Sequence, residues 1–238
     1  MAAAHHIGRP NRSRVDYEER DYLAAANALR SRGFEVAAPA PGGRRGAAGP
    51  GGSEKAGAAP VMESLLAVVP LHMDVQLPAG GRFIAADWRE LDANSFDVML
   101  VCENLEPLTE LHSFGWLERD FIRRRRTLAV FRGMPGSFPT GAAASFVAAV
   151  AKPVLGFYDF DPAGLAMAAA GPRLEALCLP PWQQLEASTR HYQRTHLYLD
   201  QAAGCRAVLD TITEGPVREA WARLKVLQCG LNQENFPR

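Results

Sequence analysis

The sequence predicts an α/β fold built on a parallel sheet of four strands with helices on both faces. Apolar runs of strand length alternate with helical segments between residues 96 and 181. Each run is nearly continuous in hydrophobic residues, which is typical of parallel strands that are covered on both faces. The chain has 26 Lys and Arg against 26 Asp and Glu, so its overall charge favours neither nucleic acid nor an acidic partner.

Strands and helices follow one another in a simple order. The predicted strands cover 96–102, 127–131, 154–161 and 173–179. Helices are predicted between them over 105–125, with an interruption near Gly115, and over 140–151 and 162–170. After Trp182 the pattern is helical to Gln233, with breaks expected near Gly204, Gly215 and Gly230.

Composition divides the chain into five parts. We expect loose residues 1–14 and a helix over 15–32 in an N-terminal helical segment (1–36), and a disordered Gly/Ala/Pro linker over 37–60. A β-hairpin is expected over 61–95, with Trp88 and Leu91 covering an edge of the main domain, 96–181, and a helical extension follows over 182–238.

No segment of the sequence predicts a membrane span. The N-terminus lacks an apolar core of signal-peptide length, and the longest uncharged run, 134–151, is interrupted by proline and glycine. We therefore expect a soluble, cytoplasmic protein without a membrane partner. The four cysteines have no Cys-x-x-Cys spacing, which favours free thiols over a zinc site.

Two aspartates end the third predicted strand, in Tyr-Asp159-Phe-Asp161-Pro-Ala-Gly-Leu. Strand side chains alternate between faces, so both carboxylates are expected on one face, before a helix that begins at Pro162. Such a pair can hold a divalent cation beside a phosphate. The alternative is that Asp161 only caps the helix and Asp159 is a solvated strand end.

The first two predicted strands also end in polar residues. Glu103-Asn104 follows the first, and Arg132-Gly133 follows the second. The carboxyl ends of parallel strands share one edge of a sheet, so Glu103 can join the two aspartates around one or two Mg²⁺ (or Mn²⁺) ions and serve in proton transfer. Gly133 allows a phosphodiester to approach the backbone closely.

These motifs resemble a Toprim domain, the metal-binding catalytic module of topoisomerases, primases and related nucleases. The Glu103-Asn104 pair, the Asp-x-Asp-Pro ending and the segment 230–234 (Gly-Leu-Asn-Gln-Glu) are most similar to one branch of the family. That branch contains the A subunit of type IIB topoisomerases and the nuclease subunit of the Wadjet plasmid-defence system. The resemblance covers the parallel-sheet segment well and the C-terminal helices loosely.

The resemblance implies a role for each site residue. Glu103 would be the general acid/base, with a share in metal binding, and Asp159 and Asp161 would be Mg²⁺ ligands. Asn104 and Arg132 would hold phosphate or water; the alternatives are that Asn104 caps the next helix and that Arg132 is a solvated charge. Glu234, in the closing segment, is expected to be an exposed helix residue.

The resemblance also implies a DNA substrate and a protein partner. Members of this branch usually carry a winged-helix region ahead of the Toprim domain, and its topoisomerases attack DNA with a tyrosine there. Tyr17 and Tyr22 are the upstream tyrosines here, and both fit a helix face. We therefore expect metal-dependent hydrolysis, as in the nuclease subunit, and a partner that delivers DNA, such as a condensin-like complex.

Two other functions fit the same residues. A Toprim fold could bind DNA or a partner without turnover. A haloacid-dehalogenase-like phosphotransferase also uses an Asp-x-Asp strand end, but there the pair usually follows the first strand. The run Arg123–Arg126 is expected on the side of the sheet opposite the carboxylates, because it precedes a parallel strand.

Overall fold

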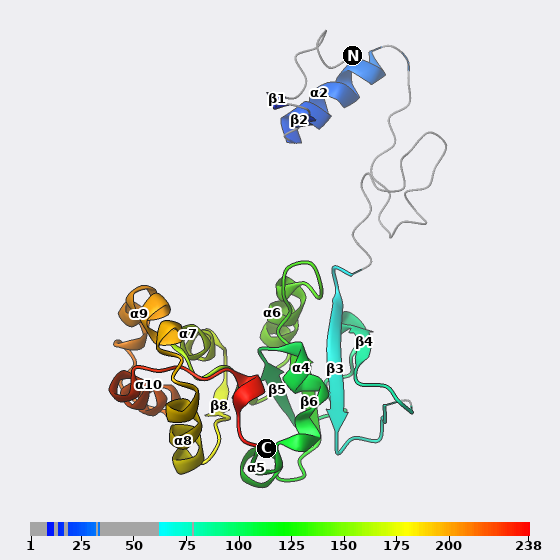
Figure 1. The fold of residues 1–238 in the computed structure, drawn as a ribbon. Coiled ribbons are helices and arrows are strands. Elements are labelled where there is room, and N and C mark those ends of the chain that lie inside the picture. The colour runs from blue at the N-terminus through cyan, green and yellow to red at the C-terminus, as the bar shows by residue number, and fades with distance from the viewer. Residues whose placement is uncertain (1–8, 12–13, 17–18, 32, 34–61, 78) are drawn as a thin grey trace. The chain divides into compact units, whose positions relative to one another are not determined.

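The computed structural model describes residues 9–11, 14–16, 19–31, 33, 62–77 and 79–238, which fall into two units, 1–60 and 61–238 (Figure 1). In the first unit, strands β1 (Arg9–Asn11) and β2 (Arg14–Asp16) pair in antiparallel fashion and helix α2 spans Glu19–Arg30. The helix predicted over 15–32 is confirmed as α2, although it begins later than predicted because residues 14–16 form β2. Of the residues expected to be loose, 9–11 and 14 belong to strands, and the others lie outside the described residues. The predicted linker, 37–60, lies outside the described residues.

The second unit contains one mixed sheet of six strands in the order β4-β3-β6-β5-β7-β8. Its strands are β3 (Leu65–Leu71), β4 (Ile84–Asp87), β5 (Val98–Cys102), β6 (Thr127–Phe131), β7 (Val154–Phe157) and β8 (Leu174–Leu177). Strands β6, β5, β7 and β8 are parallel, as predicted, whereas β3 runs antiparallel to both of its neighbours. The α/β class is therefore confirmed, and the strand number of four was wrong.

The predicted hairpin became part of the sheet because its first strand is strongly apolar. Residues 66–69 of β3 are buried, and a buried strand must pair its backbone groups on both edges. Val68 of β3 faces Val130 of β6 on one side and Ile84 of β4 on the other. The hairpin thus extends the sheet beyond β6, and Trp88 and Leu91, which follow β4, are partly buried against the core.

Short helices connect the parallel strands. They are α4 (Leu105–Thr109), η2 (Leu111–Ser113), α5 (Gly115–Leu117) and η3 (Glu118–Ile122) before β6, α6 (Thr140–Ala149) before β7, and α7 (Pro162–Ala170) before β8; η1 (Trp88–Glu90) precedes β5. The interruption predicted near Gly115 in the segment 105–125 is confirmed: Phe114 leaves helical geometry, with φ −94° and ψ 76°. Its ring instead packs 5.3 Å from that of Phe157.

The connection from β5 leads to β6 on one side of β5, and the connection from β7 leads to β8 on the other side. Right-handed connections in opposite directions place their helices on opposite faces of a sheet. This topology supports the expected arrangement with helices on both faces. It also places the switch point, where the strand order reverses, at the carboxyl ends of β5 and β7.

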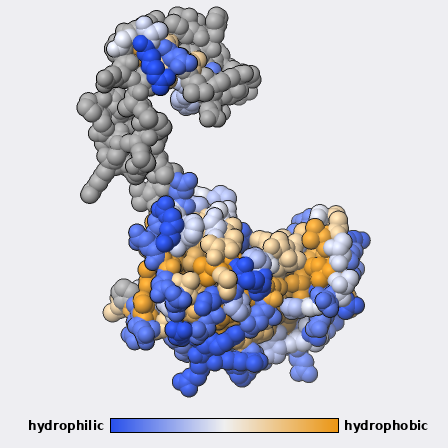
Figure 2. Space-filling model, turned by 180° about the vertical axis from the view of Figure 1, so that it is seen from behind, coloured by the Kyte–Doolittle hydropathy of each residue, from blue (hydrophilic) through white to orange (hydrophobic). Residues whose placement is uncertain are grey.

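The C-terminal residues form α8 (Trp182–Tyr192), α9 (Thr195–Leu209), α10 (Pro216–Leu227) and η4 (Gln233–Asn235). The breaks at Gly215 and Gly230 are confirmed, whereas Gly204 lies inside α9. Figure 1 shows α8, α9 and α10 gathered near β8, and the last residues returning toward β5. Figure 2 shows apolar surface over this helical lobe.

The returning segment is attached to the rest of the unit by two isolated β-bridges. Leu231 pairs with Phe160, and Gly230 pairs with Arg194 at the start of α9. Further on, the Trp116 indole N–H donates to the carbonyl of Pro237 at 2.8 Å. These contacts place residues 230–238 against the carboxyl ends of the parallel strands.

No helix among the described residues combines the length and apolarity needed to cross a membrane.

Candidate functional site

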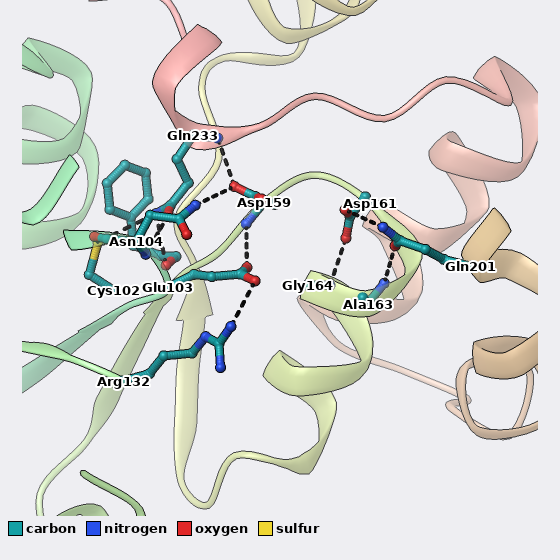
Figure 3. A network of polar contacts seen from close by, with 11 residues as sticks. Cys102, Glu103, Asn104, Arg132, Asp159, Asp161, Ala163, Gly164, Gln201 and Gln233 are labelled. Atoms are coloured by element: carbon teal, nitrogen blue, oxygen red, sulfur yellow. Dashed lines mark hydrogen bonds and ion pairs between the residues drawn. The ribbon is translucent and has the colours of Figure 1, made fainter. Parts of the chain in front are cut away.

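The predicted site residues follow three neighbouring strands at the same edge of the sheet. Glu103 follows β5, Arg132 follows β6 and Asp159 lies two residues beyond β7. Since β5 lies between β6 and β7, these three residues converge at the point where the strand order reverses (Figure 3). Open α/β sheets bind their ligands at this point.

Glu103 connects the ends of two strands. Its Oε2 accepts a 3.0 Å hydrogen bond from the backbone N–H of Asp159, and its Oε1 lies 3.5 Å from Nη2 of Arg132. The residue is 8% exposed. Burial raises the pKa of Glu103 above its usual value, and the charge of Asp161 adds to the increase, against the opposing effects of the Asp159 N–H and Arg132.

Asp159 is held by two other parts of the chain. Its Oδ1 accepts hydrogen bonds from the backbone N–H of Gln233 at 2.8 Å and from Nδ2 of Asn104 at 3.2 Å. Burial, followed by the negative charge of Glu103, raises the pKa of Asp159 to about 7. The residue is 9% exposed, so the alternative that it is a solvated strand end was wrong.

Asp161 caps helix α7. Its Oδ1 accepts the backbone N–H of Gly164 at 2.7 Å, and its Oδ2 accepts Nε2 of Gln201 at 2.9 Å. The capping role considered from the sequence is therefore confirmed. Because β7 ends at Phe157, the alternation that would place Asp159 and Asp161 on one face does not extend to them. Figure 3 shows Asp161 facing Gln201, away from the residues that hold Asp159.

Asn104 and Arg132 both belong to the site. Asn104 occupies the N-cap position of α4, but its side chain makes no capping bond and donates to Asp159 instead. The Nε of Arg132 is buried without a hydrogen-bond partner among the described residues, while its side chain as a whole is 34% exposed. Arg132 is thus a half-buried cation beside Glu103 rather than a freely solvated charge.

Gly133 has a structural explanation that needs no ligand. Its φ is +89°, and a Cβ at this position would lie 2.6 Å from the carbonyl oxygen of Phe138. Met134 also donates its N–H to that oxygen at 2.8 Å. The close approach that requires this glycine therefore comes from its own loop.

Sequence reasoning missed two glutamines that organise the site. Gln201 of α9 accepts the Ala163 N–H at 2.9 Å while it donates to Asp161. Gln233 is fully buried; its Oε1 accepts the Asn104 N–H at 3.0 Å and its Nε2 donates to the carbonyl of Phe157 at 2.9 Å. The closing motif signalled Gln233, whereas no local pattern signalled Gln201.

Glu234 differs from its expected role. It lies in η4 and is half-buried, rather than being an exposed helix residue. Its negative charge contributes to the raised pKa of both Glu103 and Asp159. A fourth carboxylate therefore acts on the electrostatics of the site.

The donor chemistry fits a hard divalent cation. Mg²⁺ is commonly held by one or two carboxylates together with water and substrate phosphate, and each carboxylate offers about four lone-pair positions. Oδ2 of Asp159 accepts no hydrogen bond from the described residues, so it can serve as a ligand. No group of three or more His, Cys, Asp or Glu among the described residues is arranged to hold a metal ion.

The run of arginines lies at the other end of the sheet, as predicted. Arg126 pairs with Asp97 at 2.6 Å, directly before the start of β5, and Arg125 pairs with Glu175 at 2.8 Å. Acidic residues therefore neutralise half of this run.

All four cysteines are free, and Cys102 and Cys178 are buried.

Residues 61–236 match a family described as a domain of unknown function, DUF7281. The chain belongs to this family. The match includes the six-stranded sheet, the three late helices and the closing segment that carries Gln233, so every element of the site lies within the DUF7281 domain. No curated protein and no solved structure matched the chain.

Gly164 tests how closely α7 must approach Asp159. A Cβ at Gly164 would lie 2.3 Å from the carbonyl oxygen of Asp159, which is backbone and cannot move aside alone. We expect Gly164→Ala to lower the free energy of unfolding by about 1–3 kcal/mol. Gly204→Ala is the control, because its Cβ meets open space in α9, and it should stabilise by about 0.5–1 kcal/mol. Urea unfolding of both variants measures these changes, and equal stabilities would contradict the close approach.

The raised pKa of Asp159 predicts a pH-dependent stability. Between about pH 4, its unfolded value, and pH 7, the native state binds the extra proton, so the free energy of unfolding falls as the pH rises through this range. Asp159→Asn removes this charge while keeping the Oδ1 acceptor. In metal-free buffer we expect the variant to be about 2–4 kcal/mol more stable than the wild type at pH 8, and equally stable near pH 4. A constant difference across this range, measured by urea unfolding, would show that Asp159 titrates normally.

Proposed function

We propose that this DUF7281 domain is a Mg²⁺-dependent phosphodiesterase of Toprim type that hydrolyses DNA; Mn²⁺ can replace Mg²⁺. The observation that carries the proposal is the placement of Glu103 and Asp159 in contact, beside Arg132, at the switch point of the sheet. Burying two like charges together is unfavourable, and a bound cation compensates for it. The resemblance of the strand-end motifs to Toprim domains supports DNA as the substrate.

Each residue has a proposed role that fits its contacts. Asp159 and Glu103 are the proposed metal ligands, whereas Asp161, whose two oxygens both accept hydrogen bonds within the protein, holds the start of α7. A bound divalent cation would polarise the phosphate that is cleaved. The hydrogen bonds to Oδ1 of Asp159 fix the orientation of this carboxylate and leave its Oδ2 available to a ligand. Glu103, with its raised pKa, is suited to proton transfer, and the half-exposed guanidinium of Arg132 can donate to a phosphate oxygen.

We propose that a protein partner delivers the DNA. Affinity for DNA depends mainly on contacts between basic residues and phosphates. The chain carries equal numbers of acidic and basic residues, and acidic residues already pair with Arg125 and Arg126. A condensin-like complex that encloses DNA would supply the missing affinity, and cytoplasmic location remains part of this proposal.

A second candidate is a DUF7281 domain that binds DNA or a partner without turnover. It is favoured by Asp161, whose two oxygens are both hydrogen-bonded within the protein. It also fits the lack of a metal-ready cluster among the described residues. In this case the carboxylates would stabilise the strand ends through Gln201 and Gln233 rather than take part in chemistry.

Cleavage of plasmid DNA separates the two candidates. We expect the full-length protein, with its partner if one is required, to nick or cut plasmid in Mg²⁺ or Mn²⁺ and to lose this activity in EDTA. Glu103→Gln and Asp159→Asn should each reduce the rate about 100-fold or more, because each removes a group that acts on the reacting phosphate.

Asp97→Asn is the matched control for this experiment. Asp97 lies directly before β5, at the opposite end of the strand from Glu103, and pairs with Arg126 on the surface. Its substitution should leave the cleavage rate unchanged. Equal cleavage by all four proteins would indicate a contaminating nuclease, and binding of DNA without cleavage in either metal would favour the second candidate.

A further inference from the structure

A concave surface lies between the end of α8 and the closing segment. It is a hollow of about 540 Å³, a size typical of ligand sites. Ser188, His191 and Tyr192 line it from α8, and residues 234–238 line it from the other side. We call it the α8 hollow. The roles proposed for the carboxylate site do not involve its aromatic wall.

That wall is an exposed aromatic pair with a cation on it. Tyr192 is 44% exposed although it is a large side chain. The ring of His191 lies 5.0 Å from it in an edge-to-face arrangement, and the guanidinium of Arg194 lies 5.7 Å from its centroid. Aromatic rings accompanied by arginine are the groups on which proteins stack unpaired bases.

The closing segment lines the α8 hollow with both signs of charge. Glu234 is a hydrogen-bond acceptor, and the cation, Arg238, is already paired with Glu110 at 2.9 Å and stacked on Phe114. Glu234 can accept hydrogen bonds from the amino groups of a base. The chemistry therefore suits a base that points inward and a sugar–phosphate backbone that stays outside, near Arg194.

The backbone fixes the aromatic pair relative to the carboxylate site. Arg194 forms a β-bridge with Gly230, and the next residue, Leu231, forms one with Phe160, between the two aspartates. Arg194 and Phe160 therefore lie on either side of the closing segment, two strand spacings or about 10 Å apart. Glu234 belongs to both regions, since it lines the hollow and its charge raises the pKa of Asp159.

We propose that the α8 hollow is a stacking subsite for an unpaired base of single-stranded DNA next to the carboxylate site. This inference rests on the proposed function, because it identifies the form of DNA that the site accepts: a single strand or a locally opened duplex. Paired bases in a duplex stack on each other and present no free face to Tyr192, so intact duplex gains nothing from this subsite.

The test measures binding in EDTA, so that cleavage does not interfere. Fluorescence anisotropy compares a labelled single-stranded oligonucleotide with the same sequence as a duplex, using the full-length chain. We expect Tyr192→Ala to weaken single-strand binding by about 5- to 100-fold and to leave duplex binding unchanged. Tyr192→Phe should retain the wild-type affinity because it keeps the ring.

Leu199→Ala is the control for loss of an exposed apolar side chain, since Leu199 is 64% exposed on α9. It should bind both forms of DNA as the wild type does. The proposal is overturned if the wild type does not bind the single strand, if Tyr192→Ala affects both forms equally, or if Tyr192→Phe loses as much affinity as Tyr192→Ala. Plasmid cleavage without single-strand binding would reject this subsite alone, and single-strand binding without cleavage would reject the catalytic proposal alone.

Discussion

The hydrogen bond from the backbone N–H of Asp159 to the Glu103 carboxylate is the contact on which the site depends. It joins the residue just beyond β7 to the residue just beyond β5, at the point where the strand order reverses. An acidic side chain that accepts a backbone N–H at a strand end could be purely structural. Here a second carboxylate, that of Asp159, is buried beside it, and burial of both raises the pKa of each.

The protein offsets the cost of these buried acids with amides. Asn104 and the backbone of Gln233 hold Asp159, and Gln201 and the N-terminus of α7 hold Asp161. Hydrogen bonds to charged groups contribute about 1.5–3 kcal/mol each, which is less than the penalty for burying an unpaired charge. The site therefore retains a net unfavourable charge interaction, as expected where a cation or a proton takes part in function.

Local signals explain what the sequence could predict. Continuous apolar runs identified the four parallel strands, and the Asp161-Pro162 pair marked the start of α7. The pairing of β3 with β6 was missed because strand pairing across an edge is not encoded in either strand alone. The break after Leu105 was expected near Gly115, and it lies at Phe114, where packing of the ring outweighs helical periodicity.

The site shows the same division between local and distant information. The strand-end motifs indicated Glu103 and Asp159, since a common edge brings parallel strand ends together. Gln201 and Gln233 contact the aspartates over separations of 40 and 74 residues, which no pattern within one segment reveals. The opposite directions of Asp159 and Asp161 depend on the early end of β7, a boundary that apolar periodicity does not define.

Anomalous diffraction from crystals soaked in Mn²⁺ tests directly whether the two strand ends bind a metal. We expect a peak within about 2–2.5 Å of carboxylate oxygens of both Glu103 and Asp159, and no such peak in Glu103→Gln crystals. A soaked crystal with no peak at the ends of β5 and β7, or with these two carboxylates apart, would contradict a metal-dependent role for the site.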